Sequence, residues 1–467
     1  MQKLFKSCYE LDKKCYEKYF LSQDILMENA AMGMADYIKK NFKIGSTILI
    51  VSGVGNNGAD GIVLARQLHK NYSIKLNIPF GVKSPMAKLQ LKRAIAIGVS
   101  LVDELEDADV IVDAIFGAGL TRNLDNDTQK IVHRLNTLSA FKIACDSPTG
   151  VDVNGLLSPI AFRADLTVTM GALVESLFVD ESKDYVGEIL QVDLGISRSL
   201  YENSSKSFVL DKSDLRLPTR EFKTSHKGNF GHVTIFCGEK EGAGIIAGSA
   251  ASRFGAGLTT LVVQDKITLP PYLMHSNEVP KNTTALAIGM GLSKHFDSDF
   301  LQKFVVKNKK PILLDADSFY IDELLVIVKQ KNRDIVLTPH PKEFSELWRR
   351  LTGEELSIDY IQQNRFKVAR EFSKKYPQVT LLLKGSNSII VQDDTLFINP
   401  LGSAKLSKGG SGDVLSGLIV SLLAQGYSAL EATIQGSLAL TACANSYEGA
   451  SYSMLATDII QQIGKLE

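Results

Sequence analysis

The chain has 467 residues, of which 45% are hydrophobic and 22% are charged. This length is too great for a single hydrophobic core, so we expect two domains, or three. Its 52 Lys and Arg residues balance 52 Asp and Glu residues, so there is no global positive charge to favour nucleic acid or an anionic membrane as a partner.

The cysteines and the N-terminus indicate the compartment. The five cysteines are odd in number and form no Cys-x-x-Cys pair, which favours a reducing compartment and argues against a structural zinc site. The opening segment, MQKLFKSCYELDKKCYEKYF, carries acids and lysines where a signal peptide has an apolar core, and no segment is suited to span a bilayer. We therefore expect a cytoplasmic protein.

The first half of the chain alternates helix-like and strand-like segments. Ser22 is suited to cap a helix whose apolar residues recur with helical spacing, and Thr47–Ser52 (TILIVS) is typical of a buried strand. A glycine loop and a helical run from Ile62 to Lys70 follow. Further strand candidates are Val110 to Val112, Lys142 to Cys145 and Leu166 to Met170. This alternation predicts a mainly parallel sheet covered by helices, ending near Gly195.

The second half repeats the same kind of alternation. Residues 197–229 are polar and lack periodicity, which predicts a linker with one edge strand. Strand-like segments then recur at His232 to Cys237, Ile312 to Leu314, Ile335 to Leu337 and Val379 to Leu383, the last leading into a hairpin turned at Asp393-Asp394. Both halves therefore read as α/β domains, which we place at residues 1–205 and 206–467.

The glycine loop of the first half, Gly53 to Gly58, satisfies G-x-G-x-x-G after a strand and before a helix, as in dinucleotide-binding folds. A hairpin at Asn57-Gly58 is the alternative, but the following residues do not alternate as a strand would. A nicotinamide oxidoreductase also needs an acid about 20 residues further on. No Asp or Glu occurs between Asp60 and Asp103, which disfavours that class.

Two acids follow predicted strands of the first half, at the edge of a parallel sheet where ligands bind. Asp113 follows VIV and Asp146 follows KIAC, although such an acid is often only a turn or helix cap. Asn57, Asp113 and Thr149 together offer hard oxygen ligands, and their low charge suits a monovalent cation. Asp146 would then be free for acid–base work.

The most informative segment is Lys408 to Gly417, KGGSGDVLSG, which runs into an apolar helical stretch. Its glycines allow close approach of a ligand, and the following helix offers free N–H groups and a positive dipole end, as a phosphate site requires. Asp413 places a carboxylate inside that site. A helix cap is the plain explanation; the alternative is a base that takes a proton from an alcohol facing a phosphoryl group.

Two other loops of the second half follow predicted strands. Lys384 to Ser388 offers amides, hydroxyls and an ammonium to phosphate, with a polar hairpin turn as the alternative. His340 stands between Pro339 and Pro341, whose rings restrict the backbone.

These segments resemble two known families. GVGNNGADG, DAIFGAGLTR and DSPTGVDVNG resemble, in order and spacing, the signature segments of NAD(P)H-hydrate epimerases. KGNFGHVTIFCG, LDADSF, LTPHPKEFSEL, LLLKGSNSIIV and GGSGDVLSGLIVSLLAQG resemble the ribokinase-like superfamily, and within it the ADP- or ATP-dependent NAD(P)H-hydrate dehydratases. The chain departs from the families at Ala59, at DSPTGVD in place of DIPSGLD, and at GSAKLSK before the final glycines.

The resemblance implies an α/β architecture, with a Rossmann-like three-layer epimerase domain at 1–205 followed by a ribokinase-like dehydratase domain at 206–467. It implies repair of hydrated NADH or NADPH: epimerisation of the R and S hydrates, then ADP-dependent dehydration of the S hydrate. Asp146 and Asp413 would be the catalytic residues. The implied epimerase substrate contacts are Asn56, Asn57, Gly58, Ala59, Asp60, Gly117, Ala118, Gly119, Leu120, Thr121, Arg122, Asn123 and Asp146. The implied dehydratase substrate contacts are Ala243, Gly291, His340 and Asp413. The implied nucleotide contacts are Lys384, Gly385, Ser386, Asn387, Ser388 and Gly412.

The same resemblance implies K⁺ at Asn57, Asp113 and Thr149 of the epimerase domain, Mg²⁺ on the nucleotide, and ADP as co-substrate with ATP as a possible substitute. The expected partners are NAD(P)H hydrates and an adenine nucleotide, with neither nucleic acid nor membrane, and the expected assembly is a homo-oligomer. A ribokinase-like vitamin or sugar kinase with a non-catalytic N-terminal binding domain is the alternative, because Gly-x-Gly-Asp is common to that superfamily.

Overall fold

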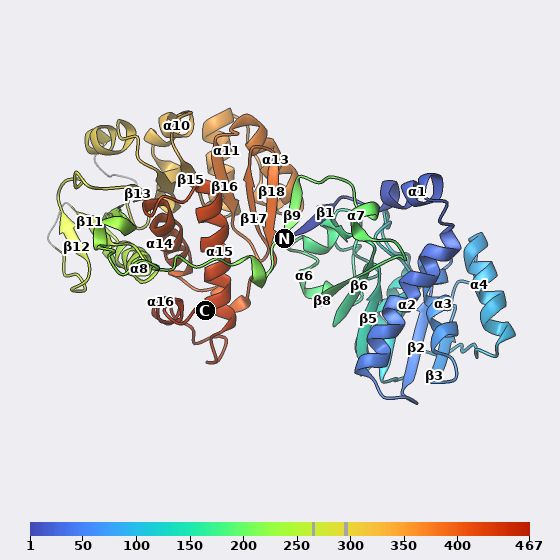
Figure 1. Ribbon diagram of the computed structural model, residues 1–467. Coiled ribbons are helices and arrows are strands. Elements are labelled where there is room, and N and C mark those ends of the chain that lie inside the picture. The colour runs from blue at the N-terminus through green and yellow to red at the C-terminus, as the bar shows by residue number, and fades with distance from the viewer. Residues whose placement is uncertain (264–266, 294–297) are drawn as a thin grey trace. The chain divides into compact units, whose positions relative to one another are not determined.

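The computed structural model describes residues 1–263, 267–293 and 298–467. The chain divides into two compact units, Gln2–Ser205 and Lys206–Glu467 (Figure 1). Within the described residues no helix combines the length and apolarity needed to cross a membrane.

The N-terminal unit is built on a parallel sheet of six strands in the order β3-β2-β4-β5-β6-β8. The strands are β2 (Thr47–Ser52), β3 (Ser73–Asn77), β4 (Val110–Ala114), β5 (Phe141–Cys145), β6 (Leu166–Met170) and β8 (Glu188–Val192). A separate short parallel pair joins β1 (Gln2–Phe5) to β7 (Leu173–Val174). Because the chain runs from β2 to β3 on one side and then to β4 on the other, the strand order reverses at β2 and β4. Ligands of open α/β sheets bind at such a reversal.

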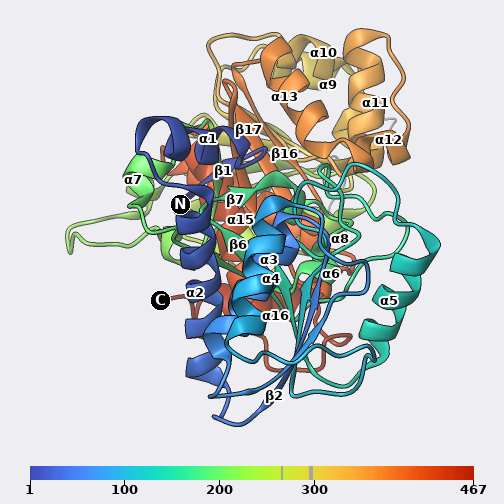
Figure 2. The same cartoon turned by 90° about the vertical axis from the view of Figure 1, so that its right-hand side faces the viewer.

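Helices cover both faces of this sheet. They are α1 (Tyr9–Lys18), α2 (Gln23–Asn41), α3 (Asn56–Leu68), α4 (Pro85–Ala96), α5 (Asn126–Thr137), α6 (Lys183–Val186) and α7 (Arg198–Tyr201). Alternate residues of β2 point to opposite faces: Ile48 and Ile50 pack with α2, α3 and α4, whereas Leu49 and Val51 pack with α5. Figure 2 shows α5 apart from α2, α3 and α4. The unit therefore has three layers, and its central strands β2 and β4 are almost wholly buried because both faces of the sheet are covered.

The C-terminal unit is built on a longer mixed sheet, in the order β12-β11-β10-β13-β14-β15-β16-β17-β18-β9. Its strands are β9 (Ser207–Val209), β10 (His232–Phe236), β11 (Leu258–Val262), β12 (Met274–Ser276), β13 (Ala285–Ile288), β14 (Ile312–Leu314), β15 (Ile335–Leu337), β16 (Val379–Leu383), β17 (Ser388–Gln392) and β18 (Thr395–Asn399). The strands from β12 to β16 are parallel. A hairpin of β17 and β18 then continues the sheet antiparallel.

The helices of this unit are α8 (Glu241–Arg253), α9 (Ser298–Leu301), α10 (Glu323–Val328), α11 (Pro341–Thr352), α12 (Ile358–Gln363), α13 (Arg365–Lys375), α14 (Ser411–Ala424), α15 (Ala429–Asn445) and α16 (Ala456–Ile463). One large core joins α8, α14, α15 and α16 to alternate residues of the sheet, such as Val233, Ala287 and Leu382. α14 is buried along almost its whole length between α8 and α15, which fixes the position of its first turn.

Most of the expected elements are present, with one change that matters for the site. The hairpin turns at Asp393 and Asp394, both with positive φ, and residues 197–229 contain one short strand, β9. The helix expected from Ile62 begins instead at Asn56. The loop after β2 is therefore shorter than expected, and Asn56 to Asp60 form the first turns of α3.

Candidate active sites

The N-terminal site forms where the segments after β2, β4 and β5 meet. A Cβ atom on Gly53 would lie 2.0 Å from the Ile115 carbonyl oxygen, so only glycine lets the turns after β2 and β4 approach so closely. The amide of Gly53 donates to the carbonyl of Ala114 over 2.9 Å. The start of α3 is thereby held beside the end of β4.

Asp113 ends β4 and is fully buried. Its Oδ1 accepts from the Thr149 hydroxyl over 2.7 Å and from the Ile115 amide over 3.1 Å, and its Oδ2 accepts from the Thr149 amide over 2.7 Å. Burial raises the pKa of this carboxyl to about 6, against the lowering effect of those hydrogen bonds. No ion pair of Asp113 occurs within the described residues, so its charge is buried without a protein cation.

The Asn57 side chain lies between the Cys145 carbonyl and the Gly117 amide. In one amide orientation its nitrogen donates to Cys145 O over 3.1 Å and its oxygen accepts from Gly117 N over 3.3 Å. This orientation satisfies both groups, whereas the opposite one leaves the amide oxygen facing the Cys145 carbonyl. The structure thus brings Asn57 to the end of β5 and to Gly117 in the segment after β4.

Asp146 follows β5 in an unusual backbone conformation, with φ of 69°. A non-glycine residue with positive φ is strained, and such residues cluster at functional sites. Its Oδ2 accepts from the Ala118 amide over 2.8 Å, so the segment around Gly117 holds the carboxylate. Burial raises the pKa of Asp146, and hydrogen bonds from Ala118 and Met170 oppose the rise.

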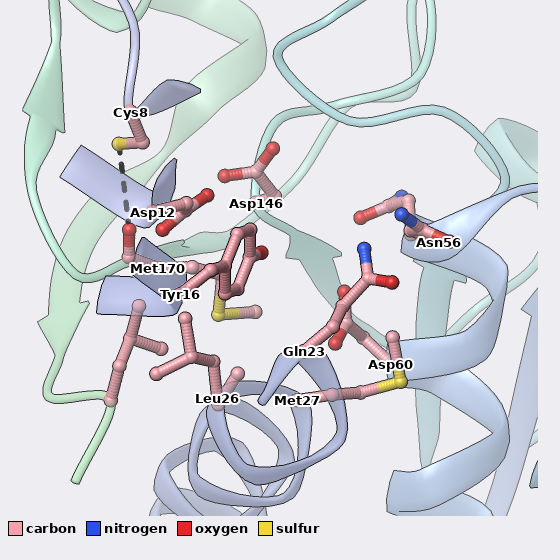
Figure 3. Close-up of a pocket in the computed structure, with 13 residues that line it drawn as sticks. Cys8, Asp12, Tyr16, Gln23, Leu26, Met27, Asn56, Asp60, Asp146 and Met170 are labelled. Atoms are coloured by element: carbon pink, nitrogen blue, oxygen red, sulfur yellow. Dashed lines mark hydrogen bonds between the residues drawn. The ribbon is translucent and has the colours of Figure 1, made fainter. Parts of the chain in front are cut away.

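A cavity of about 200 Å³ lies beside these residues. Figure 3 shows Cys8, Asp12 and Tyr16 on one side of it and Asn56 and Asp60 on the other, with Asp146 between them. The lining residues are Cys8, Asp12, Tyr16, Gln23, Leu26, Met27, Ala30, Asn56, Asn57, Asp60, Asp146, Met170 and Leu194.

The cavity gathers only part of the expected epimerase residues. The cavity is lined by Asn56, Asn57, Asp60 and Asp146. Ala118 and Gly117 do not line it, but both lie beside the Asp146 carboxylate. Gly58, Ala59 and Leu120 are buried and do not line it. Gly119, Thr121 and Arg122 of the DAIFGAGLTR segment, and Asn123 after it, are exposed and do not line it.

Sequence reasoning missed the contribution of the N-terminal segment, which supplies Cys8, Asp12 and Tyr16. None of these three residues is among the site residues expected from the sequence. The spacing of Cys8, Asp12 and Tyr16, four residues apart on one face of a helix, was the available signal.

The C-terminal site forms at the carboxyl ends of β13, β14, β15 and β16, which are neighbours in the sheet. Asp315 follows β14 and is 2% exposed; Lys384 follows β16 and its Nζ lies 2.6 Å from Asp315 Oδ1. The hydroxyl of Ser416, in α14, donates to Asp315 Oδ2 over 2.7 Å. The buried carboxylate thus ties the ammonium of Lys384 to the helix that carries Asp413. Sequence reasoning gave Asp315 no role.

α14 begins directly after Gly410, whose φ of 93° is in the left-handed region. A Cβ on Gly412 would lie 3.5 Å from Lys384 Nζ, so the ammonium is next to the first turn of the helix. The carboxyl of Asp413 makes no hydrogen bond within the described part of the chain, so it does not cap its own helix there. Burial raises its pKa to about 7, the charge of Asp315 adds to the rise, and Lys384 opposes it. A pKa near neutrality suits a general base.

The other expected dehydratase contacts lie in two places. Ala243 and Gly291 are brought together through Lys240, whose amide donates to Gly291 O and whose carbonyl accepts from the Ala243 amide, each over 3.1 Å. His340 caps α11: its Nδ1 accepts from the Glu343 amide over 3.3 Å, and its Nε2 lies 3.0 Å from Glu343 Oε1. Within the described residues its ring therefore bonds to its own helix.

The Lys384 to Ser388 loop is held in place by Arg365, a residue that sequence reasoning missed. The buried guanidinium of Arg365 donates to the carbonyls of Lys384, Leu383 and Asn387 over 3.1, 3.2 and 3.1 Å. No local pattern marks Arg365, because it lies far from the loop in sequence.

The stretch that departs from the family pattern, GSAKLSK, bonds to the first residue of α14, because the Ser411 hydroxyl donates to the carbonyls of Leu406 and Lys408. Lys405 Nζ donates to Tyr447 O over 2.7 Å and Lys408 Nζ donates to Tyr452 O over 2.9 Å. Both ammonium groups therefore bond to the segment that precedes α16.

The fold and the two sites define an α/β enzyme with a Rossmann-like unit followed by a ribokinase-like unit. A family model described as YjeF-related protein N-terminus matches residues 23–175, and one described as NAD(P)H-hydrate dehydratase matches residues 233–465. The bifunctional NAD(P)H-hydrate repair enzyme Nnr of Helicobacter pylori is 38% identical over 100% of both chains, and that of Dictyoglomus turgidum is 32% identical over 97% of this chain and 95% of its own.

Among solved structures, the ADP/ATP-dependent NAD(P)H-hydrate dehydratase from Bacillus subtilis, co-crystallised with ATP and Mg²⁺, is similar at 26% identity with a TM-score of 0.45. The match covers 53% of this chain and 92% of that one. On the full-length similarity to the curated relatives, the chain belongs to the family of bifunctional NAD(P)H-hydrate repair enzymes.

Proposed function

We propose that the two units divide the repair of hydrated NADH and NADPH between them. Residues 1–205 would interconvert the R and S hydrates, and residues 206–467 would dehydrate the S hydrate at the expense of an adenine nucleotide. The observation that carries the proposal is Asp413, a carboxyl with a pKa of about 7 at the start of a buried helix, beside the Lys384 ammonium.

In the dehydration step Asp413 would remove the proton of the ring hydroxyl as its oxygen attacks the terminal phosphoryl group. The amides at Gly410 and Gly412, the helix end and Lys384 would stabilise the transferring charge. The phosphorylated oxygen then leaves as phosphate, driven by the ring nitrogen lone pair. Loss of a proton from the neighbouring carbon restores the double bond. Asp315 would hold Lys384 in place throughout, since its two oxygens bind Lys384 and Ser416.

The expected phosphoryl donor is ADP, with ATP as a possible substitute, and it would bind along Lys384 to Ser388 and at Gly412. Arg365 supports this assignment, because it binds the carbonyls of Lys384 and Asn387 and so fixes both ends of the loop. Magnesium on the nucleotide would neutralise phosphate charge. Within residues 1–263, 267–293 and 298–467, no group of three His, Cys, Asp or Glu side chains is arranged to hold a metal ion.

In the epimerase unit Asp146 would move protons at the ring hydroxyl, and Asn57, Asp113 and Thr149 would hold K⁺. One feature fits that ion: the buried Asp113 carboxyl lacks a cationic partner in the described residues. Bound there, K⁺ would supply a fixed positive charge that keeps Asp113 ionised.

The cavity residues Asn56 and Asp60 would contact the substrate, as would Gly117 to Asn123 on the neighbouring segment. In the other unit Ala243, Gly291 and His340 would contact the ring and its substituents.

We further propose that the chain works as a homo-oligomer in the cytoplasm. All five cysteines are free thiols and four of them are buried, which supports a reducing compartment, and light scattering of the purified chain tests the assembly.

The deciding experiment incubates the protein with a mixture of R- and S-hydrated NADH, ADP and Mg²⁺, and follows the return of dihydronicotinamide absorbance. Wild type should restore the whole mixture, whereas Asp146→Asn should stop after the S hydrate is used and Asp413→Asn should restore none. Parallel runs with ATP, and with Na⁺ replacing K⁺, test the donor and the ion. Nucleotide consumption with vitamin or sugar alcohols, and none with the hydrate, would instead indicate the kinase alternative.

A further inference from the structure

The cavity of the N-terminal unit contains a carboxyl that the proposed function leaves without a role. Asp12, Asp60 and Asp146 all line it, and none of the described lining residues is Lys or Arg. Asp12 comes from α1, Asp60 from the first turns of α3 and Asp146 from the segment after β5. Three acids in one cavity without a cationic side chain cannot all be ionised at little cost.

Asp12 is held in a fixed position by Tyr201. The Tyr201 hydroxyl donates to Asp12 Oδ1 over 2.7 Å, and the tyrosine is 2% exposed. Asp12 Oδ2 has no hydrogen-bond partner within the described residues, and Figure 3 shows the side chain beside Asp146 at the cavity. One oxygen is therefore used for orientation and the other is available to a ligand.

The charges around Asp12 favour a shared proton. Burial raises the pKa of Asp12, the hydrogen bond from Tyr201 lowers it, and the charge of Asp146 raises it. The other titratable groups that face the cavity are Cys8, Tyr16 and Asp60, and burial raises the pKa of the Cys8 thiol to about 12, so that it stays neutral. Two interacting carboxyls of this kind lose their protons in two steps and can hold one proton between them.

Epimerisation of the hydrate needs one acid and one base at the same time. Hydration of an enamine places the hydroxyl on the carbon bonded to nitrogen, because nitrogen stabilises positive charge there. To invert that carbon, an acid protonates the hydroxyl, the C–O bond breaks with loss of water, and the nitrogen lone pair forms C=N⁺. Water then adds to the opposite face and gives a proton to a base, so that atoms and charge balance and a proton has moved from one carboxyl to the other.

We propose that Asp12 is the second catalytic carboxyl of the epimerase unit, acting with Asp146 as an acid–base pair, and that Tyr201 is its positioning residue. This inference rests on the proposed function. We assign Asp60 to substrate contact and not to proton transfer, because no described side chain fixes its carboxyl as Tyr201 fixes that of Asp12.

The test measures exchange between the R and S hydrates by chromatography, without nucleotide, for Asp12→Asn and Asp146→Asn. Each should slow exchange by ~10²–10⁴-fold, the usual contribution of a general acid or base. Glu17→Gln is the matched control: it also removes a carboxyl from α1, but Glu17 is exposed and does not line the cavity. Binding of the R hydrate measured by calorimetry, together with a thermal midpoint no lower than that of wild type, shows that the variants are folded.

The outcomes separate the two levels of inference. Loss of exchange in Asp146→Asn with near-normal exchange in Asp12→Asn would overturn the role of Asp12 alone. Normal exchange in Asp146→Asn would instead overturn the role proposed above for Asp146. If exchange in water enriched in ¹⁸O leaves the hydroxyl unlabelled, beyond an enzyme-free control, the water-loss step is wrong.

Tyr201→Phe distinguishes catalysis from packing. The exchange rate should be bell-shaped in pH, because one carboxyl must be protonated and the other ionised. Removing the Tyr201 hydroxyl removes a donor that stabilises ionised Asp12, so the pKa of Asp12 rises and one limb of the profile moves to higher pH. A uniform decrease with both limbs in place would mean that Tyr201 and Asp12 only support the structure.

Discussion

Replacing Asp413 by Asn should stabilise the C-terminal unit while it removes activity. The pKa of Asp413 rises from 3.8 to about 7 on folding, so the folded state binds the proton more tightly than the unfolded state does. The free energy of unfolding therefore falls as pH rises from about 4 to about 7, and the penalty is complete above that range. At 1.36 kcal/mol for each pKa unit, the penalty is about 4 kcal/mol, an upper limit because the side chain keeps some solvent.

The chain provides its own probe for this measurement. Its one tryptophan, Trp348, is 3% exposed in α11 of the C-terminal unit, so its fluorescence reports unfolding of that unit in urea. Asp413→Asn should raise the free energy of unfolding by up to about 4 kcal/mol at pH 8 and by less than about 1 kcal/mol at pH 4. Glu448→Gln, an exposed carboxyl in the same unit, should change neither value. An equal effect of Asp413→Asn at both pH values would refute the reasoning.

Three further measurements test the sites. Dehydration should require ionised Asp413, so kcat/KM should rise with pH through about 7, and Asp413→Asn should abolish it while epimerisation, measured by chromatography, continues. Gly117→Ala would put a Cβ 2.5 Å from Asp146 Oδ2 and should slow epimerisation far more than Gly119→Ala, whose Cβ meets nothing within 4 Å. Arg365→Lys cannot reproduce a guanidinium that reaches three carbonyls, so the KM for ADP should rise ~10-fold or more with epimerisation intact; an unchanged KM would place the nucleotide elsewhere.

The sequence alone determined much of the fold, because its signals are local. Buried parallel strands such as Thr47–Ser52 are continuous apolar runs, and Ser22 marks the start of α2 by accepting from the Ile25 amide over 3.4 Å. The predicted start of α3 was wrong by six residues, because the helix begins at Asn56 and not at Ile62. Glycines have no side chain to add to the apolar spacing by which a helix is recognised.

The site residues divide in the same way. Asp113, Asp146, Lys384 and Asp413 could be identified from sequence, because each follows a strand or begins a helix and strand ends of a parallel sheet meet at one edge.

Other partners depended on contacts between distant segments. The sequence separates Tyr201 from Asp12 by 189 positions, Ser416 from Asp315 by 101 and Arg365 from Asn387 by 22. No periodicity or motif joins such pairs. These pairs come within hydrogen-bond distance only because α7 packs near α1, α14 packs over the end of β14, and α13 packs against the Lys384 to Ser388 loop. Burial in those places also raises the pKa values of Asp12 and Asp413, and burial is a property of the folded chain, not of the residues.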